Sequence, residues 1–180
     1  FVISDGTSVL PLMPAQDHKT IFDDDRGPMT GGMGAYSPVP AMDEALSRRV
    51  MEEIAAPVFA AMTREGAPYA GVLFVQIMIT KDGPRVVEFN CRFGDPECQT
   101  ILPLLDEDIL PIFEAAGQGR GLPASLRWRS GSSVCVVLAS QGYPGPVRSG
   151  DEITGLDAEG GLPGGVNVFH AGTARRDGRL

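Results

Sequence analysis

The chain has 180 residues, 43% of them hydrophobic, and a formal net charge of −8 at pH 7. This acidic balance argues against nucleic acids and membrane surfaces as partners, because both attract a basic protein face. The longest apolar runs, at residues 70–79 and 134–139, are too short to cross a bilayer, and the first residues lack the pattern of a signal peptide. Three cysteines without a Cys-X-X-Cys pair indicate reduced thiols, as in a cytoplasmic protein, and no zinc site.

The first part of the chain predicts a β-hairpin and then a long irregular loop. Strands are expected at residues 1–4 and 7–13, because Asp5-Gly6 favours a two-residue turn. Residues 14–40 have neither a helical nor a strand period, which is typical of a functional loop. Its segment Thr30-Gly31-Gly32-Met33-Gly34 can present backbone N–H groups to a phosphate or a carboxylate.

Three polar side chains come before these glycines. Asp17, His18 and Lys19 offer a base, a titratable imidazole and a cation. The alternative for His18, taken by itself, is a hydrogen-bonded surface histidine. The glycine loop lacks the Gly-Lys-Ser/Thr ending of a P-loop, so it does not indicate that kind of nucleotide site.

A helix and two antiparallel strands are expected next. The helix covers residues 43–63, where apolar residues recur every four positions and Asp43 can cap the start. Pro57 removes one backbone hydrogen bond and should kink it. The strands cover residues 70–79 and 85–90.

The second of these strands carries the most informative residues. Val86, Val87 and Phe89 indicate a buried strand, while Glu88 and Asn90 share one of its faces because successive side chains alternate. A carboxylate beside an amide oxygen suits Mg²⁺, which prefers oxygen ligands. The alternative is an edge strand with a polar outer face.

The segment after this strand predicts a turn and the start of a helix. Arg92 lies in the turn, Asp95 is a favoured N-cap, and Pro96 suits the first helical position. Asp95 and Glu97 either cap this helix or meet a cationic, amine-bearing substrate. Helices are expected near residues 96–105 and 107–118.

The remaining segments predict a second domain. Residues 119–133, rich in Gly, Pro, Arg and Ser, form the expected boundary between domains at 1–128 and 131–180. Strands at residues 134–139 and 166–170 would belong to the second domain.

Three long motifs occur in a distinctive order. Residues 16–19 read Gln-Asp-His-Lys, residues 27–38 read Gly-Pro-Met-Thr-Gly-Gly-Met-Gly-Ala-Tyr-Ser-Pro, and residues 88–99 read Glu-Phe-Asn-Cys-Arg-Phe-Gly-Asp-Pro-Glu-Cys-Gln. They resemble the phosphoribosylamine–glycine ligases, also called glycinamide ribonucleotide synthetases, of the ATP-grasp superfamily. Residues 131–145 and 168–173 resemble the domain that follows in that family.

Two residues depart from the pattern of this family. Met29 stands where the family usually has Asn, and Gln76 stands in a strand where the family is apolar or has glycine.

The resemblance implies an α+β fold. It would comprise the C-terminal lobe of an ATP-grasp domain, an antiparallel sheet with flanking helices, followed by the start of a small, mostly β C-terminal domain. The family's chain is far longer, so the expectation is a fragment truncated at both ends that lacks the nucleotide lid and has little activity alone.

The resemblance also implies a reaction. The family uses ATP to join glycine to 5-phosphoribosylamine through a glycyl phosphate, with Mg²⁺ or Mn²⁺, in purine biosynthesis. By this resemblance Glu88 and Asn90 hold the metal ion, and Arg92, Asp95 and Glu97 act in catalysis. The substrate side is lined by Asp17, His18, Lys19, Thr30, Gly31, Gly32, Met33 and Gly34.

Two alternatives to this reaction stay open from the sequence. One is a different ATP-grasp carboxylate–amine ligase, because Glu-X-Asn-X-Arg is shared widely; the glycine loop argues against it. The other is a non-catalytic fragment that binds a nucleotide or a partner. The expected partners are small molecules, with no nucleic acid and no membrane.

Overall fold

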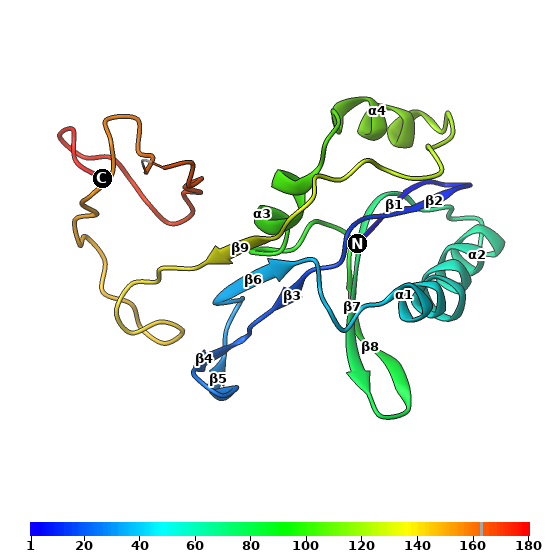
Figure 1. Ribbon diagram of the computed structural model, residues 1–180, viewed down its shortest axis with the longest axis horizontal. Coiled ribbons are helices and arrows are strands. Elements are labelled where there is room, and N and C mark those ends of the chain that lie inside the picture. Colours follow the sequence, from blue (N-terminus) through cyan, green and yellow to red (C-terminus); the bar gives the residue numbers. More distant parts are fainter. Residues whose placement is uncertain (163) are drawn as a thin grey trace. The chain divides into compact units, whose positions relative to one another are not determined.

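The computed structural model describes residues 1–162 and 164–180, which fall into two compact units, Phe1–Val137 and Leu138–Leu180. The first unit is built on a four-stranded sheet in the order β2-β1-β7-β8 (Figure 1). Each pair of neighbouring strands is antiparallel. The sheet and its flanking helices confirm the α+β class expected from the sequence.

The sheet consists of two hairpins. Strands β1 (Val2–Asp5) and β2 (Val9–Pro11) form the first, and β7 (Ala70–Thr80) and β8 (Gly83–Asn90) form the second. Both hairpins were predicted. β1 pairs with β7, which leaves β2 and β8 as the two edge strands.

The carboxylate of Asp5 fixes the first turn and ties it to a distant segment. Its Oδ1 accepts backbone N–H groups from Thr7 (2.9 Å) and Ser8 (2.6 Å), and its Oδ2 accepts the N–H of Gly121 (2.8 Å), 116 residues later. The bond from Ser8 is the main cause that holds the pKa of Asp5 far below its usual value, although burial of the carboxyl opposes it.

One face of the sheet is covered by a long helix with a wider turn in its middle. Helix α1 (Glu44–Val50), the π-helical turn η1 (Met51–Ala55) and α2 (Ala56–Arg64) follow without a break. Asp43 caps the start as predicted, since its side chain accepts the N–H of Leu46 at 2.7 Å. The π turn comes just before Pro57, the residue predicted to kink the helix because it cannot donate a backbone hydrogen bond. This helix packs on the sheet through a cluster of Val2, Ala55, Phe59 and Leu73.

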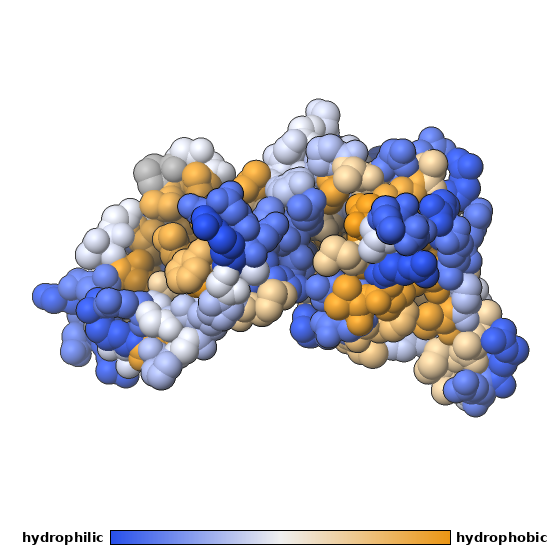
Figure 2. Space-filling model, turned by 90° about the horizontal axis from the view of Figure 1, so that it is seen from below, coloured by the Kyte–Doolittle hydropathy of each residue, from blue (hydrophilic) through white to orange (hydrophobic). Residues whose placement is uncertain are grey.

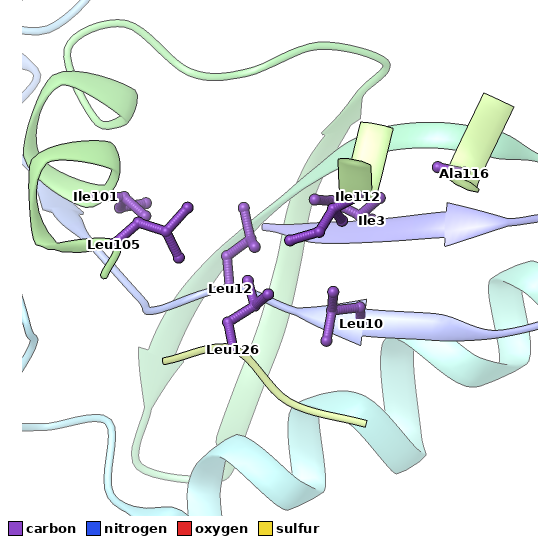
Figure 3. Close-up of a cluster of buried hydrophobic side chains, with 8 residues drawn as sticks. All are labelled: Ile3, Leu10, Leu12, Ile101, Leu105, Ile112, Ala116 and Leu126. Carbon is purple, nitrogen blue, oxygen red and sulfur yellow. The ribbon is translucent and has the colours of Figure 1, made fainter. Parts of the chain in front are cut away.

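The other face carries the larger core. Strand neighbours alternate between the faces, so Ile3 points here whereas Val2 points to the long helix. The covering elements are α3 (Cys98–Ile101), the 3₁₀ turn η2 (Leu102–Leu104) and α4 (Leu110–Gln118). Figure 3 shows the cluster, which comprises Ile3, Leu10, Leu12, Ile101, Leu105, Ile112, Ala116 and Leu126.

The segment 14–40 is more regular than the sequence suggested. It contains β3 (Gln16–Asp17), β4 (Thr20–Phe22), β5 (Arg26–Met29) and β6 (Gly34–Ser37). The β4 and β5 strands pair with each other, and β3-β6-β9 form a separate sheet with β9 (Ser133–Val136). The prediction of an irregular loop was wrong because strands of two to four residues are too short to show a period.

The second unit has little regular structure. Within residues 138–162 and 164–180 the only β pairing is an isolated bridge between Arg176 and Arg179. The predicted strand at 134–139 is present as β9, in the first unit, whereas the predicted strand at 166–170 is not formed. Val166 and Phe169 are each 55% exposed, because no described strand lies beside them. The domain limits 1–128 and 131–180 stay a prediction.

Among the described residues, no helix combines the length and the apolar character that a membrane crossing requires.

Candidate functional site

Strand β8 presents Glu88 and Asn90 on one face, as predicted. The Nδ2 of Asn90 donates a hydrogen bond to Oε1 of Glu88 at 2.9 Å. Glu88 is exposed and Asn90 is half-buried, so their oxygens are open to a ligand.

The strand itself is not buried, which corrects the sequence-based expectation. Val86, Val87 and Phe89 are 42%, 54% and 41% exposed, because β8 is an edge strand with β7 as its only neighbour in the sheet of the described chain. The edge position that the alternative expected is therefore present, but the exposed residues of the strand are not only polar, and the metal site stays a prediction. Figure 2 shows apolar side chains on the face of the molecule that includes this hairpin.

The polar pair on β8 fits a divalent cation by its chemistry. A carboxylate oxygen and an amide oxygen are hard ligands, and an exposed site leaves room for water and phosphate oxygens. The amide N–H of Asn90 donates to the carboxylate of Glu88. A bound cation would take the place of this N–H beside the carboxylate. Turning the amide by half a rotation exchanges its nitrogen for its oxygen, after which both side chains would offer oxygen.

Arg92 follows two residues after this pair and is exposed. Its Nη1 donates to the backbone oxygen of Phe93 at 2.9 Å, and no carboxylate of the described chain lies within ion-pair distance of it. Most of its guanidinium donors therefore stay available to an anion.

Asp95 and Pro96 do not start the helix in the predicted way. Helix α3 begins at Cys98 and has Glu97 at its N-cap position, without a capping bond from that side chain. The residues before it form a turn, in which the N–H of Cys98 donates to the backbone oxygen of Gly94 at 3.1 Å. Asp95 instead accepts a hydrogen bond from the amide of Gln99 at 2.6 Å. The capping prediction was wrong because this turn takes up the residues that would have formed the first helical positions.

Glu97 is a buried carboxylate without hydrogen-bond partners. It is 2% exposed, and neither of its oxygens has a partner within residues 1–162 and 164–180. Burial is the main cause that raises the pKa of Glu97, and the negative charge of Asp17 raises it further while Lys19 opposes the shift. A buried carboxylate of this kind lowers the stability of the fold unless a ligand or another polar group binds it.

The fold brings three predicted site residues together at this point. Asp17, on β3, forms an ion pair with Lys19 in which Nζ lies 2.5 Å from Oδ2. Both side chains lie close enough to Glu97 to act on its charge, although about 80 residues separate them along the chain. The cluster has two carboxylates and one ammonium, which leaves an excess of negative charge when both acids are ionised.

The glycine loop packs against the turn that carries Asp95. Gly32 has φ +136°, and a Cβ built on it would lie 2.6 Å from Cδ of Pro96 and 3.3 Å from the oxygen of Asp95. Gly34 has a different neighbour, since its Cβ would lie 2.7 Å from the backbone oxygen of Cys135 on β9. These glycines therefore serve close backbone packing.

The loop's backbone N–H groups are largely used within the protein. The N–H of Thr30 donates to the backbone oxygen of Lys19 (2.7 Å), and the N–H of Met33 donates to the backbone oxygen of His18 (2.7 Å). The N–H of Gly32 donates to the hydroxyl of Thr30 (3.0 Å). In this arrangement these groups do not form an open cradle for a phosphate. The substrate role of the loop stays a prediction.

His18 and Met33 border two shallow cavities, of about 320 and 240 Å³. Three consecutive aspartates from Asp23 to Asp25 help line the larger one, and Tyr36 with β9 lines the smaller. The rings of His18 and Tyr36 have centroids 5.9 Å apart. Neither cavity is lined by Glu88 or Asn90.

The Glu88 pair and the Glu97 cluster lie on the same side of the main sheet. Phe74 pairs with Asn90 across β7 and β8, so the two side chains share a face. The ring of Phe74 packs on that of Phe1, with centroids 4.5 Å apart. A Cβ built on Gly94 would touch both Phe1 (2.8 Å) and the carboxylate of Glu97. Two aromatic rings therefore connect the two polar groups.

One polar neighbour of Glu88 was not assigned a role from the sequence. Gln76 lies directly opposite Glu88 in the ladder between β7 and β8. The signal that could have found it is the single amide in an otherwise apolar strand.

Comparisons with known proteins identify the class. Residues 1–98 match the family model of the phosphoribosylglycinamide synthetase ATP-grasp (A) domain, and residues 133–180 match the phosphoribosylglycinamide synthetase C domain. The chain belongs to the phosphoribosylglycinamide synthetase family, and its first part is an ATP-grasp domain.

Individual relatives agree over the whole chain. A phosphoribosylamine–glycine ligase of Mesorhizobium japonicum is 47% identical over 180 residues, which are 100% of this chain and 42% of the relative. The trifunctional purine biosynthetic protein adenosine-3 of Gallus gallus is 49% identical over 178 residues, 98% of this chain and 18% of that protein.

A solved structure is also similar. The crystal structure of phosphoribosylamine–glycine ligase from Thermotoga maritima matches with a TM-score of 0.83 and 34% identity, covering 99% of this chain and 43% of that one. The chain therefore spans less than half the length of these relatives.

Proposed function

We propose that this chain is part of an ATP-dependent carbon–nitrogen ligase that joins glycine to 5-phosphoribosylamine. The products would be glycinamide ribonucleotide, ADP and phosphate, formed through a glycyl phosphate. The observation that carries the proposal is the 47% identity to a phosphoribosylamine–glycine ligase along all 180 residues. Because the chain covers 42% of that relative, the activity is assigned to the longer protein, and the 180 residues alone would have little of it.

We propose Glu88 and Asn90 as the ligands of the Mg²⁺ or Mn²⁺ that the reaction needs. When bound, the ion neutralises the oxygens of the ATP phosphates and lowers their repulsion of the attacking carboxylate. The carboxylate of Glu88 supplies the charge, and the amide oxygen of Asn90 adds a neutral ligand beside it.

Arg92 would bind the anionic group during phosphoryl transfer. Its planar fork suits either the transferring phosphoryl group or the acyl phosphate that follows. The absence of a carboxylate partner for Arg92 among the described residues supports this role.

Glu97, with Asp95 and Asp17, would orient an amine. A buried carboxylate without partners can accept a hydrogen bond from the amine and take its proton as the nitrogen attacks the carbonyl. Burial raises the pKa of Glu97, which makes its carboxylate a stronger base and supports the assignment. The glycine loop, His18 and Lys19 would line the substrate side of this carboxylate.

We infer a cytoplasmic location and small-molecule partners only. Cys91, Cys98 and Cys135 are free thiols, which supports a reducing compartment.

The proposed function is tested by Glu88→Ala in the full-length protein that carries this chain. ADP release that depends on both glycine and 5-phosphoribosylamine is expected to fall by about 100-fold or more, because a metal ligand is lost. The matched control is Glu52→Ala, which removes an exposed carboxylate on the long helix and should leave the rate unchanged. A Glu88→Ala protein with the parent's rate and Mg²⁺ dependence would contradict the metal assignment. A parent that forms no ADP with these two substrates would contradict the reaction.

A further inference from the structure

The ladder between β7 and β8 places a third oxygen-bearing side chain beside Glu88 and Asn90. Gln76 pairs with Glu88, and Phe74 pairs with Asn90. Directly paired residues point to the same face, with Cβ atoms about 4.5–5.5 Å apart. Gln76, Glu88 and Asn90 therefore form one group on one face of the hairpin.

The ladder is regular from Phe74 to Gln76 and becomes irregular directly after this group. The register shifts between Gln76 and Ile77, because Ile77 pairs with Val86 and Val87 is left without a partner. This irregularity is a β-bulge, which redirects the side chains near it. Val86 then points to the opposite face with Ile77, while Glu88 stays opposite Gln76.

The side-chain amide of Gln76 makes no hydrogen bond to another residue of the described chain. Gln76 is half-buried, and its side chain makes no hydrogen bond or ion pair within residues 1–162 and 164–180. The neighbours of Gln76 along β7 are apolar, from Val72 to Ile79. The amide atoms of Gln76 reach solvent, so its oxygen is open to a ligand on the face that carries Glu88 and Asn90.

We propose that Gln76 supplies its amide oxygen as a third protein ligand to the divalent cation held by Glu88 and Asn90. This inference rests on the proposed function, because it adds to the same cation site. Mg²⁺ prefers six oxygens in octahedral geometry and keeps waters where the protein offers few ligands. The oxygen of Gln76 would replace one water and bind without adding negative charge. The site would then hold its ion more tightly than a carboxylate and one amide can.

The test measures how strongly Mn²⁺ and ADP bind together in the full-length protein. Calorimetry gives the dissociation constant of ADP with and without Mn²⁺, and their ratio reports the coupling between metal and nucleotide. Gln76→Met keeps the length of the side chain and removes its oxygen, and should reduce that ratio roughly tenfold, as the loss of polar groups around a metal ion does. Gln76→Glu should increase it. The matched control is Gln118→Met, at the exposed end of α4, which should leave the ratio unchanged.

The outcomes separate this inference from the function on which it rests. If Glu88→Ala abolishes the coupling and Gln76→Met retains the parent's ratio, Gln76 is not a ligand and only this inference fails. If Mn²⁺ does not tighten ADP binding in the parent, or if Glu88→Ala leaves the tightening intact, the cation site itself is wrong. Far-ultraviolet circular dichroism of each variant reports folding, and Gln76→Glu provides a second, opposite change should Gln76→Met disturb the strand.

Discussion

Replacing Glu97 by glutamine should make the protein more stable and less active. The carboxylate is 2% exposed, neither oxygen has a hydrogen-bond partner among the described residues, and Asp17 lies close enough to repel it. Glu97→Gln has nearly the same shape and no charge. The variant therefore removes the electrostatic cost of a buried anion and also removes the group proposed to receive the amine's proton.

The gain in stability should depend on pH with a definite sign. Burial raises the pKa of Glu97 in the folded protein above its unfolded value. The folded state then binds the proton more readily, so the contribution of Glu97 to stability is fully present below the unfolded pKa and is lost as pH rises through the folded pKa. Parent and variant should have similar stability at low pH. At alkaline pH the variant should be more stable by about 1–3 kcal/mol, the desolvation cost of one unsatisfied buried group.

Urea unfolding between pH 5 and 8.5 measures this difference, and the ligase assay measures the loss of activity. Glu52→Gln is the matched control, because Glu52 is exposed and the same chemical change there should alter neither quantity. A Glu97→Gln protein that is less stable than the parent at pH 8.5 would refute the reasoning, since it would mean that the carboxylate has a stabilising partner. Full activity of the variant would refute the role proposed for its proton.

Two further changes test the packing that positions the site. Gly32→Ala should lower the free energy of unfolding by about 2–4 kcal/mol and reduce activity, because φ is +136° and the new Cβ would lie 2.6 Å from Pro96. Gly66→Ala has a positive φ but nothing within 4 Å, so urea unfolding should show a loss of only about 1–2 kcal/mol; equal losses would argue against the loop contact. Asp5→Asn should lower the unfolding free energy by about 2–4 kcal/mol, since charge-assisted hydrogen bonds are lost. Because the pKa of Asp5 is lowered in the folded protein, its contribution to the unfolding free energy is present above the unfolded pKa and is lost as pH falls. The difference in unfolding free energy between parent and variant should therefore shrink below about pH 4. A difference that stays constant with pH would contradict the assignment.

The elements that the sequence predicted are those in which local chemistry decides the structure. The helix at 43–63 has an apolar residue every four positions and an aspartate at its cap, and the hairpins have turn residues between alternating runs. The short strands between residues 14 and 40 escaped prediction because β6 pairs with β3 nearby and with β9 about 100 residues later. Only the tertiary pairing makes those two-residue to four-residue segments into strands.

The candidate site, too, could be predicted from the sequence only in part. Glu88 and Asn90 could be placed on one face from the period of a strand, and their contact at 2.9 Å follows from it. The proximity of Glu97 to Asp17 and Lys19 could not be predicted, because it depends on how α3 packs beside a distant strand. The exposure of β8 also escaped prediction, since an apolar strand at a sheet edge has the same sequence pattern as a buried one.

Two polar side chains of the candidate site, Glu97 and Gln76, make no hydrogen bond within the described residues and could each bind a ligand. The buried oxygens of Glu97 lower stability, whereas the amide of Gln76 reaches solvent, and the fold places both side chains on the same side of one sheet. The packed rings of Phe1 and Phe74, with centroids 4.5 Å apart, connect the two groups. A substrate with phosphate at one end and an amine at the other would meet a cation site beside Gln76 and a carboxylate at Glu97. The stability lost at Glu97 is therefore consistent with a role in the proposed reaction, and a variant that recovers this stability should lose the corresponding part of substrate binding.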